Sequence, residues 1–226
     1  ASAAGVGGLR PTYAYTVEAF DDYLSHLNPG GFLAINLLLK VPPRDTLKLF
    51  ATAVAALERA GIAQPGQRLA IIRSWKTTTL LVKNGEIMAG EADMIRSFAR
   101  DRAFDVAFYP GMPRGEANQY NLLDSPYFYD GATVLLGPAR GSFLERYKFD
   151  LRPARDDRPY FFDFFRWRSL PELMALRAQG AMPLIEWGYL ILFATLVQAA
   201  LLSAVLILLP LGTLRRRAGR FRGRAR

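Results

Sequence analysis

One stretch near the end of this 226-residue chain constrains its fold more than any other. Residues 187–214 carry no charged side chain and are rich in Leu, Ala, Ile and Val. As a helix rising about 1.5 Å per residue, the stretch extends roughly 40 Å, against a hydrocarbon core of about 30 Å in a bilayer. Trp187 and Tyr189 lie at one end, where amphipathic rings favour the headgroup level. The stretch predicts a transmembrane helix over 184–214; a buried core helix is the alternative.

The positive charge of the chain is concentrated behind this predicted helix. There are 29 Lys and Arg against 20 Asp and Glu, a formal net charge of +9. Seven of the arginines lie in residues 215–226, and every acidic residue lies at or before Glu186. We interpret this basic tail as a membrane flank that contacts anionic headgroups. A nucleic-acid-binding arm is the alternative, but only Phe221 is present for base stacking, so no nucleic-acid partner is expected.

Several kinds of chemistry are excluded by composition. The chain has no cysteine, which removes disulfides, thiolate catalysis and cysteine-ligated metals. The chain has one histidine, His26, so a metal site built from several histidines is excluded and a serine–histidine triad is improbable. We interpret His26 as a solvated surface residue. No metal is therefore expected. The opening residues ASAAGVGG lack an initiator Met and a signal sequence, and we interpret the chain as a piece of a longer protein.

The first 110 residues alternate between helical and strand patterns, which predicts an α/β fold. The run over 32–39 is almost entirely apolar, as is typical of a strand buried on both faces. Asp45 is the predicted N-cap of the helix after it. The predicted elements are a helix over 16–27, a strand over 32–39, a helix from 45 to about 61, an antiparallel hairpin of strands 68–74 and 77–82, a helix over 92–102 and a strand over 104–109.

Three phrases, in this order and followed by the apolar stretch, resemble a known family. Residues 13–34 contain YAYTVEAF and NPGGFLA, residues 121–129 read NLLDSPYFY, and residues 156–162 read DDRPYFF. They resemble bacterial membrane-bound spermidine synthase-like proteins, within the superfamily of class I SAM-dependent methyltransferases and aminopropyltransferases. The first phrase is similar to the fifth helix and fifth strand of that class.

The resemblance implies both a domain organisation and an activity. Residues 1–110 would be the C-terminal half of a Rossmann-like SAM-transferase sheet ending in an antiparallel hairpin, and residues 111–183 an aromatic-rich connector with helices. The transmembrane helix and the basic tail would follow, in a multi-pass protein of the bacterial inner membrane. The cofactor would be S-adenosylmethionine or its decarboxylated form, bound by a half preceding Ala1. The chain alone is then expected to be inactive, and its catalytic and cofactor-binding residues are unknown.

Four residues are predicted to contact a small amine substrate. Asn36 falls where aminopropyltransferases usually place a glutamine facing the amine, and Trp75 lies in the hairpin region that contributes to the diamine pocket. Tyr120 and Asn121 belong to a polar loop, with Asn118 and Asp124, that either faces a substrate or orders itself by hydrogen bonds. Because Lys76 would repel a polyamine, the alternative is a non-catalytic membrane scaffold or transport-associated pseudo-transferase module.

Two further segments each have two interpretations. Asp156 and Asp157 form either an acid–base pair or a loop in which an aspartate pairs with Arg158 and Pro159 fixes the turn. Residues 160–167 hold six aromatic side chains, which either stack on bases or pack against the sheet or the lipid interface. We favour the structural interpretation of both.

Overall fold

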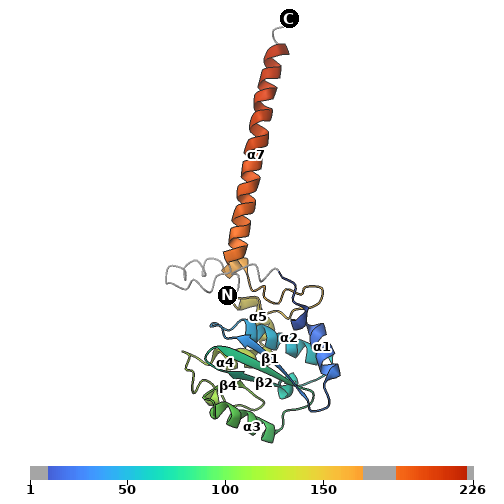
Figure 1. The fold of residues 1–226 in the computed structure, drawn as a ribbon, viewed down its shortest axis with the longest axis vertical. Helices are drawn as coiled ribbons and strands as arrows, with labels where there is room; N and C mark the ends of the chain where they lie inside the picture. Colours follow the sequence, from blue (N-terminus) through green and yellow to red (C-terminus); the bar gives the residue numbers. More distant parts are fainter. Residues whose placement is uncertain (1–9, 170–186, 223–226) are drawn as a thin grey trace. The chain divides into compact units, whose positions relative to one another are not determined.

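The computed structural model describes residues 10–169 and 187–222 of the chain, which divide into an α/β body and the separate helix α7 (Figure 1). The sheet has four strands in the order β1-β3-β2-β4, and every neighbouring pair is antiparallel. The α/β fold and the antiparallel hairpin predicted over 68–74 and 77–82 are therefore confirmed. The strands are β1 Phe32–Leu38, β2 Leu69–Arg73, β3 Thr77–Lys83 and β4 Asp105–Phe108. The α-helices are α1 Val17–His26, α2 Asp45–Arg59, α3 Ala89–Arg100, α4 Tyr127–Leu136, α5 Arg140–Arg146 and α7 Trp187–Arg222, and short 3₁₀ turns lie at Tyr13–Tyr15, Pro65–Arg68, Arg114–Glu116 and Trp167–Ser169.

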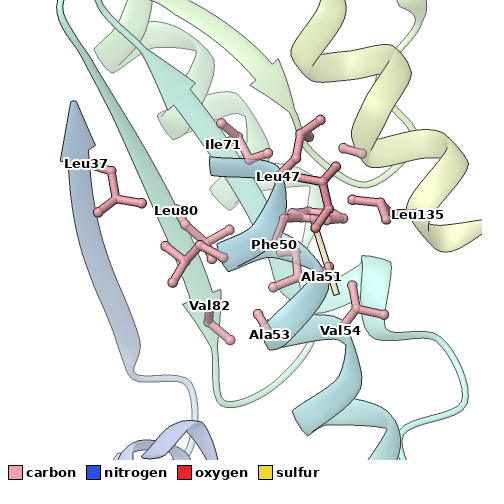
Figure 2. Packing of buried hydrophobic residues seen from close by; sticks show 14 of the residues in the cluster. Leu37, Leu47, Phe50, Ala51, Ala53, Val54, Ile71, Leu80, Val82 and Leu135 are labelled. Carbon is pink, nitrogen blue, oxygen red and sulfur yellow. The ribbon is translucent and has the colours of Figure 1, made fainter. Parts of the chain in front are cut away.

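One face of the sheet carries the main hydrophobic core. Figure 2 shows side chains of β1, β2 and β3 meeting those of α2 and α4. Phe50 of α2 is fully buried, and its ring packs edge-on against Phe108 of β4, with ring centroids 5.4 Å apart. An irregularity between Ile71 and Ile72 in the β2–β4 register accompanies the entry of both Ala107 and Phe108 into this core. Burial of this apolar area is the main stabilising contribution to the body.

The other face is covered only in part, which corrects the prediction for the strand over 32–39. Helix α3 packs over β2 and β4, where Ile72, Ile95 and Val106 form a second cluster. β1 lies at the edge of the sheet, and its exposed and less exposed residues alternate. Phe32 remains 40% exposed and Leu38 66% exposed. β1 is therefore buried on one face, not on both, because no helix of the described chain covers its second face.

The predicted helices lie where the structure has α1, α2 and α3, but their first and last residues differ from those predicted. Thr16 caps α1, accepting a hydrogen bond from the Ala19 N–H. Asp45 is not the N-cap of α2 but its first residue, and its carboxylate forms an ion pair with Lys40 at 2.8 Å. α3 begins three residues before the predicted Ala92, because the Glu91 carboxylate accepts the Met88 N–H and stabilises an earlier start.

The aromatic connector folds onto the body. Phe161 and Phe164 are at most 1% exposed and belong to the main core, which bears out packing in preference to base stacking. They lie close to Lys48 of α2, whose ammonium is 4.9 Å from the centre of the Phe164 ring. Around the two aspartates, the Arg158 N–H donates to the Arg155 carbonyl across a turn, but among the described residues the ion pair of Arg158 is with Asp163 at 3.8 Å, not with the predicted Asp156 or Asp157.

Helix α7, Trp187–Arg222, confirms a helix over the whole stretch 187–214 and extends beyond it through Arg222. Residues 184–186 of the predicted segment and 223–226 of the predicted tail lie outside the described residues. The large apolar side chains described between Leu192 and Leu208 are all at least 41% exposed. Among the described residues, none of the helices has the combined length and hydropathy needed to cross a bilayer.

Candidate functional site

The four predicted substrate residues lie toward one end of the sheet. β1 and β2 run in the same direction, so both finish where β3 and β4 begin. Asn36 is near the end of β1, and Trp75 lies in the turn after β2. Tyr120 and Asn121 are held against Asp105, the first residue of β4. In open α/β sheets, ligands bind outside the carboxyl ends of the strands, so this end is the candidate site.

The side chains of Asn36 and of Asp105, the anchor of the Tyr120–Asn121 loop, lie on opposite faces of the sheet. Asn36 is in register with Thr79, which pairs with Ile72 in the α3-covered face. The adjacent row joins Thr78, Arg73 and Asp105, and it faces the other way because side chains alternate along a strand. Asn36 and the partner of Tyr120 and Asn121 therefore do not share one pocket.

β1 offers a free edge next to Asn36. The Asn84 N–H donates to the Gly31 carbonyl (2.9 Å), and the Leu39 N–H donates to the Lys76 carbonyl (2.7 Å). Bonding positions alternate in an antiparallel pair, so the odd-numbered residues of β1 bond to β3. The outward-facing N–H and C=O groups belong to Phe32, Ala34, Asn36 and Leu38. Within residues 10–169 and 187–222, no strand pairs with them.

This edge lacks the usual protection of an edge strand. Its sequence FLAINLL has no charge and no proline, the residues that normally block a further strand from pairing. The Asn36 side chain is exposed beside it. The edge can therefore accept a strand, and Asn36 would then lie next to the new pair.

Trp75 lies in a tight turn, and the ammonium of the next residue, Lys76, packs against its ring. The Ser74 hydroxyl accepts the N–H groups of Lys76 and Thr77 and so fixes the turn. Trp75 is 66% exposed, and the Lys76 ammonium lies 4.0 Å from its ring centre. Trp75 therefore already has a cation–π partner, which a cationic substrate would have to displace.

A buried ion pair, which the sequence did not reveal, organises the loop of Tyr120 and Asn121. Arg73 is 3% and Asp105 1% exposed, and they are joined by a hydrogen bond of 2.9 Å. The Asp105 carboxylate also accepts the backbone N–H groups of residues 119–121 and the Asn121 side-chain amide. The Asn118 amide bonds to both backbone groups of Leu123. The hydrogen bonds of Asn118 and Asn121 thus order the loop.

The electrostatics of Asp105 follow from these contacts. Burial by itself would raise its pKa, but the N–H groups of Tyr120 and Asn121 and the charge of Arg73 outweigh it, so the pKa lies below the usual value. A carboxylate that is ionised and accepts this many donors is a poor general base. Asp105 is therefore a structural anchor. The only indication of this ion pair in the sequence is that Arg73 lies near the end of one predicted apolar strand and Asp105 near the start of another.

A cavity of about 420 Å³ lies beside this loop, between α3 and the start of β4. Tyr120 lines it together with Arg96, Arg100 and Glu116. Glu116 accepts a hydrogen bond from the Tyr109 hydroxyl at 2.8 Å. Burial and this carboxylate raise the pKa of Tyr109 to about 12, so its phenol stays protonated at neutral pH. In the described residues, no cluster of three or more acidic or histidine side chains could hold a metal ion.

Comparisons of the chain with protein-family models, with curated proteins and with solved structures gave no match.

Proposed function

We propose that this chain is the substrate-side part of a spermidine synthase-like, SAM-type transferase of the bacterial inner membrane. In this proposal, a cofactor-binding half of the protein pairs with the free edge of β1. The observation that carries it is the row of outward N–H and C=O groups on an uncharged edge strand, beside the exposed Asn36. The phrases in the sequence that resemble this family support the choice of cofactor.

The proposed reaction is nucleophilic substitution at a sulfonium carbon of S-adenosylmethionine or its decarboxylated form. When bound, this cofactor would supply a sulfonium carbon for attack by the acceptor nitrogen, with a neutral thioether as the leaving group and a proton released from the nitrogen. Asn36 would hydrogen-bond the amine, and Trp75 would stack on it. Tyr120 and Asn121 stay in the proposal only as a loop bounding the acceptor side, since the Asn121 amide is bonded to Asp105.

The second candidate is a non-catalytic membrane scaffold or transport-associated pseudo-transferase module. Two contacts favour it: Lys76 covers Trp75, and Asp105 holds Asn121. A diamine would meet the Lys76 charge on entering.

Membrane attachment is a separate part of the proposal. The described part of α7 by itself lacks the length and hydropathy of a span. We propose that the whole predicted segment 184–214 is buried in the lipid bilayer and that the basic tail, residues 215–226, meets anionic headgroups. The large apolar side chains described between Leu192 and Leu208 are exposed on all sides of the helix, including Leu201, Leu202, Val205 and Leu206. An apolar surface of this extent is not stable in water without a partner. Lipid acyl chains would cover the apolar side chains, and anionic headgroups would attract the basic tail.

Calorimetry on the protein extended upstream of Ala1 in its gene tests the transferase proposal. We expect binding of S-adenosylmethionine or its decarboxylated form, and an Asn36→Ala variant that binds the cofactor normally. In a steady-state assay of the transfer, that variant should raise the KM for the amine by up to about tenfold, the value of one lost hydrogen bond. Gln64→Ala, which removes an exposed amide before β2, is the matched control and should change neither value. The absence of any cofactor signal would exclude the enzyme and favour the scaffold.

A further inference from the structure

A second, smaller cavity is formed where the connector turns over the start of α2. Its volume is about 190 Å³, room for several waters or one oxyanion group. Four cations line it, against two carboxylates, so its lining carries a net positive charge. The charged residues are Lys48, Arg152, Arg155 and Arg158, with Asp157 and Asp163.

Two of these cations are brought together by the backbone. The Arg158 N–H donates to the Arg155 carbonyl at 2.9 Å, so the turn holds two like charges on one rim. Each forms one long ion pair, Arg155 with Glu18 at 4.0 Å and Arg158 with Asp163 at 3.8 Å. Neither guanidinium makes a hydrogen bond to another of the described residues. Both are more than half exposed, so their donors are available to a ligand.

The other two cations are fixed in place and shape the cavity. Arg152 is paired with Asp150 at 2.6 Å. Lys48 is 4% exposed, and its ammonium donates to the carbonyls of Asp163 (2.7 Å) and Tyr160 (3.4 Å). Its charge therefore lies at the cavity wall, where it also interacts with the Asp150 carboxylate, and it adds to the positive potential of the rim.

We propose that this cavity binds a phosphate group, held by Arg155 and Arg158 and attracted by Lys48 and Arg152. Guanidinium groups match phosphate oxygens with paired N–H donors, and an anion between two arginines relieves their repulsion. The group can come from an anionic lipid headgroup or from a free phosphate compound. The proposal stands apart from the transferase proposal, since it uses residues on the connector and α2 only.

Titration calorimetry with inorganic phosphate tests this on the full chain in neutral maltoside micelles. We expect millimolar binding, and an affinity at least about tenfold lower for the double variant Arg155→Gln/Arg158→Gln. The matched control Arg102→Gln/Arg146→Gln removes two exposed charges, one just after α3 and one at the end of α5, and should bind phosphate as the native chain does. Both pairs are exposed, and equal melting temperatures would show that the variants are folded.

Micelles doped with phosphatidylglycerol distinguish the two sources of the phosphate. If the lipid headgroup is the ligand, the apparent phosphate affinity of the native chain falls in doped micelles; if a free compound is the ligand, it stays the same. Either result supports the site. No phosphate signal in neutral micelles, or an equal loss in the control variant, would overturn it.

Discussion

The double variant Leu201→Arg/Val205→Arg is expected to leave bacterial membranes and appear in the supernatant after alkaline carbonate extraction, where the native chain stays in the pellet. The two side chains are one helical turn apart on α7 and are 63% and 50% exposed. An arginine at the centre of a lipid-buried helix costs about 2.5–3.5 kcal/mol on insertion scales, so two cost roughly 5–7 kcal/mol. A loss of that size shifts the membrane-bound fraction from nearly all to a minority.

The control for this experiment adds the same charge elsewhere. Leu122 and Met94 are exposed apolar residues of the body, 75% and 65% accessible, and Leu122→Arg/Met94→Arg should leave the chain in the pellet. If the α7 variant also stays in the pellet, or if the native chain is extracted, α7 is not buried in lipid and this part of the account is wrong.

The second large effect is on stability: Asp105→Ala should lower the free energy of unfolding by about 3–5 kcal/mol, because it leaves the buried Arg73 charge without its partner. For a chain of this size, the melting temperature should fall on the order of 10 °C. Asp101→Ala is the matched control. Its carboxylate is 64% exposed and 3.8 Å from Arg100, so its loss should change stability by at most about 0.5 kcal/mol.

Acid unfolding checks the same carboxylate without relying on the variant alone. The pKa of Asp105 in the folded chain lies below its usual value of about 4, so its stabilising contribution is complete above that value and is lost as the pH falls below it. Asp150, bonded to Arg152, also has a strongly lowered pKa and adds to the slope. In Asp105→Asn the loss of stability between about pH 5 and pH 2 should be shallower than in the native chain. Parallel curves, or a stable Asp105→Ala variant, would contradict the role given to this ion pair.

The local elements were predictable because their signals are local. The hairpin of β2 and β3 follows from two strand-like runs joined by a short turn, and α1 follows from the helical spacing of Val17, Phe20 and Leu24. The burial of Phe161 and Phe164 was also among the expectations for the aromatic connector.

The features that define the candidate site are long-range, and the sequence did not reveal them. An apolar sequence such as that of Phe32–Leu38 is found both in central strands and in edge strands. Whether it lies at the edge depends on the order of strands in the sheet, which the sequence does not show. Arg73 and Asp105 are 32 residues apart, and nothing local indicates that they pair. Asn121 was predicted as a substrate residue from its place in a polar loop, while its side chain bonds to that distant carboxylate.

Amide hydrogen exchange resolved along β1 tests the central claim, that the free edge of β1 receives the cofactor-binding half. In this chain, the amides of Phe32, Ala34, Asn36 and Leu38 should exchange quickly, while those of Leu33, Ile35 and Leu37 are protected by β3. In the protein extended upstream of Ala1, the first four should become protected as well. Four outward amides that exchange equally fast in both proteins would contradict the account.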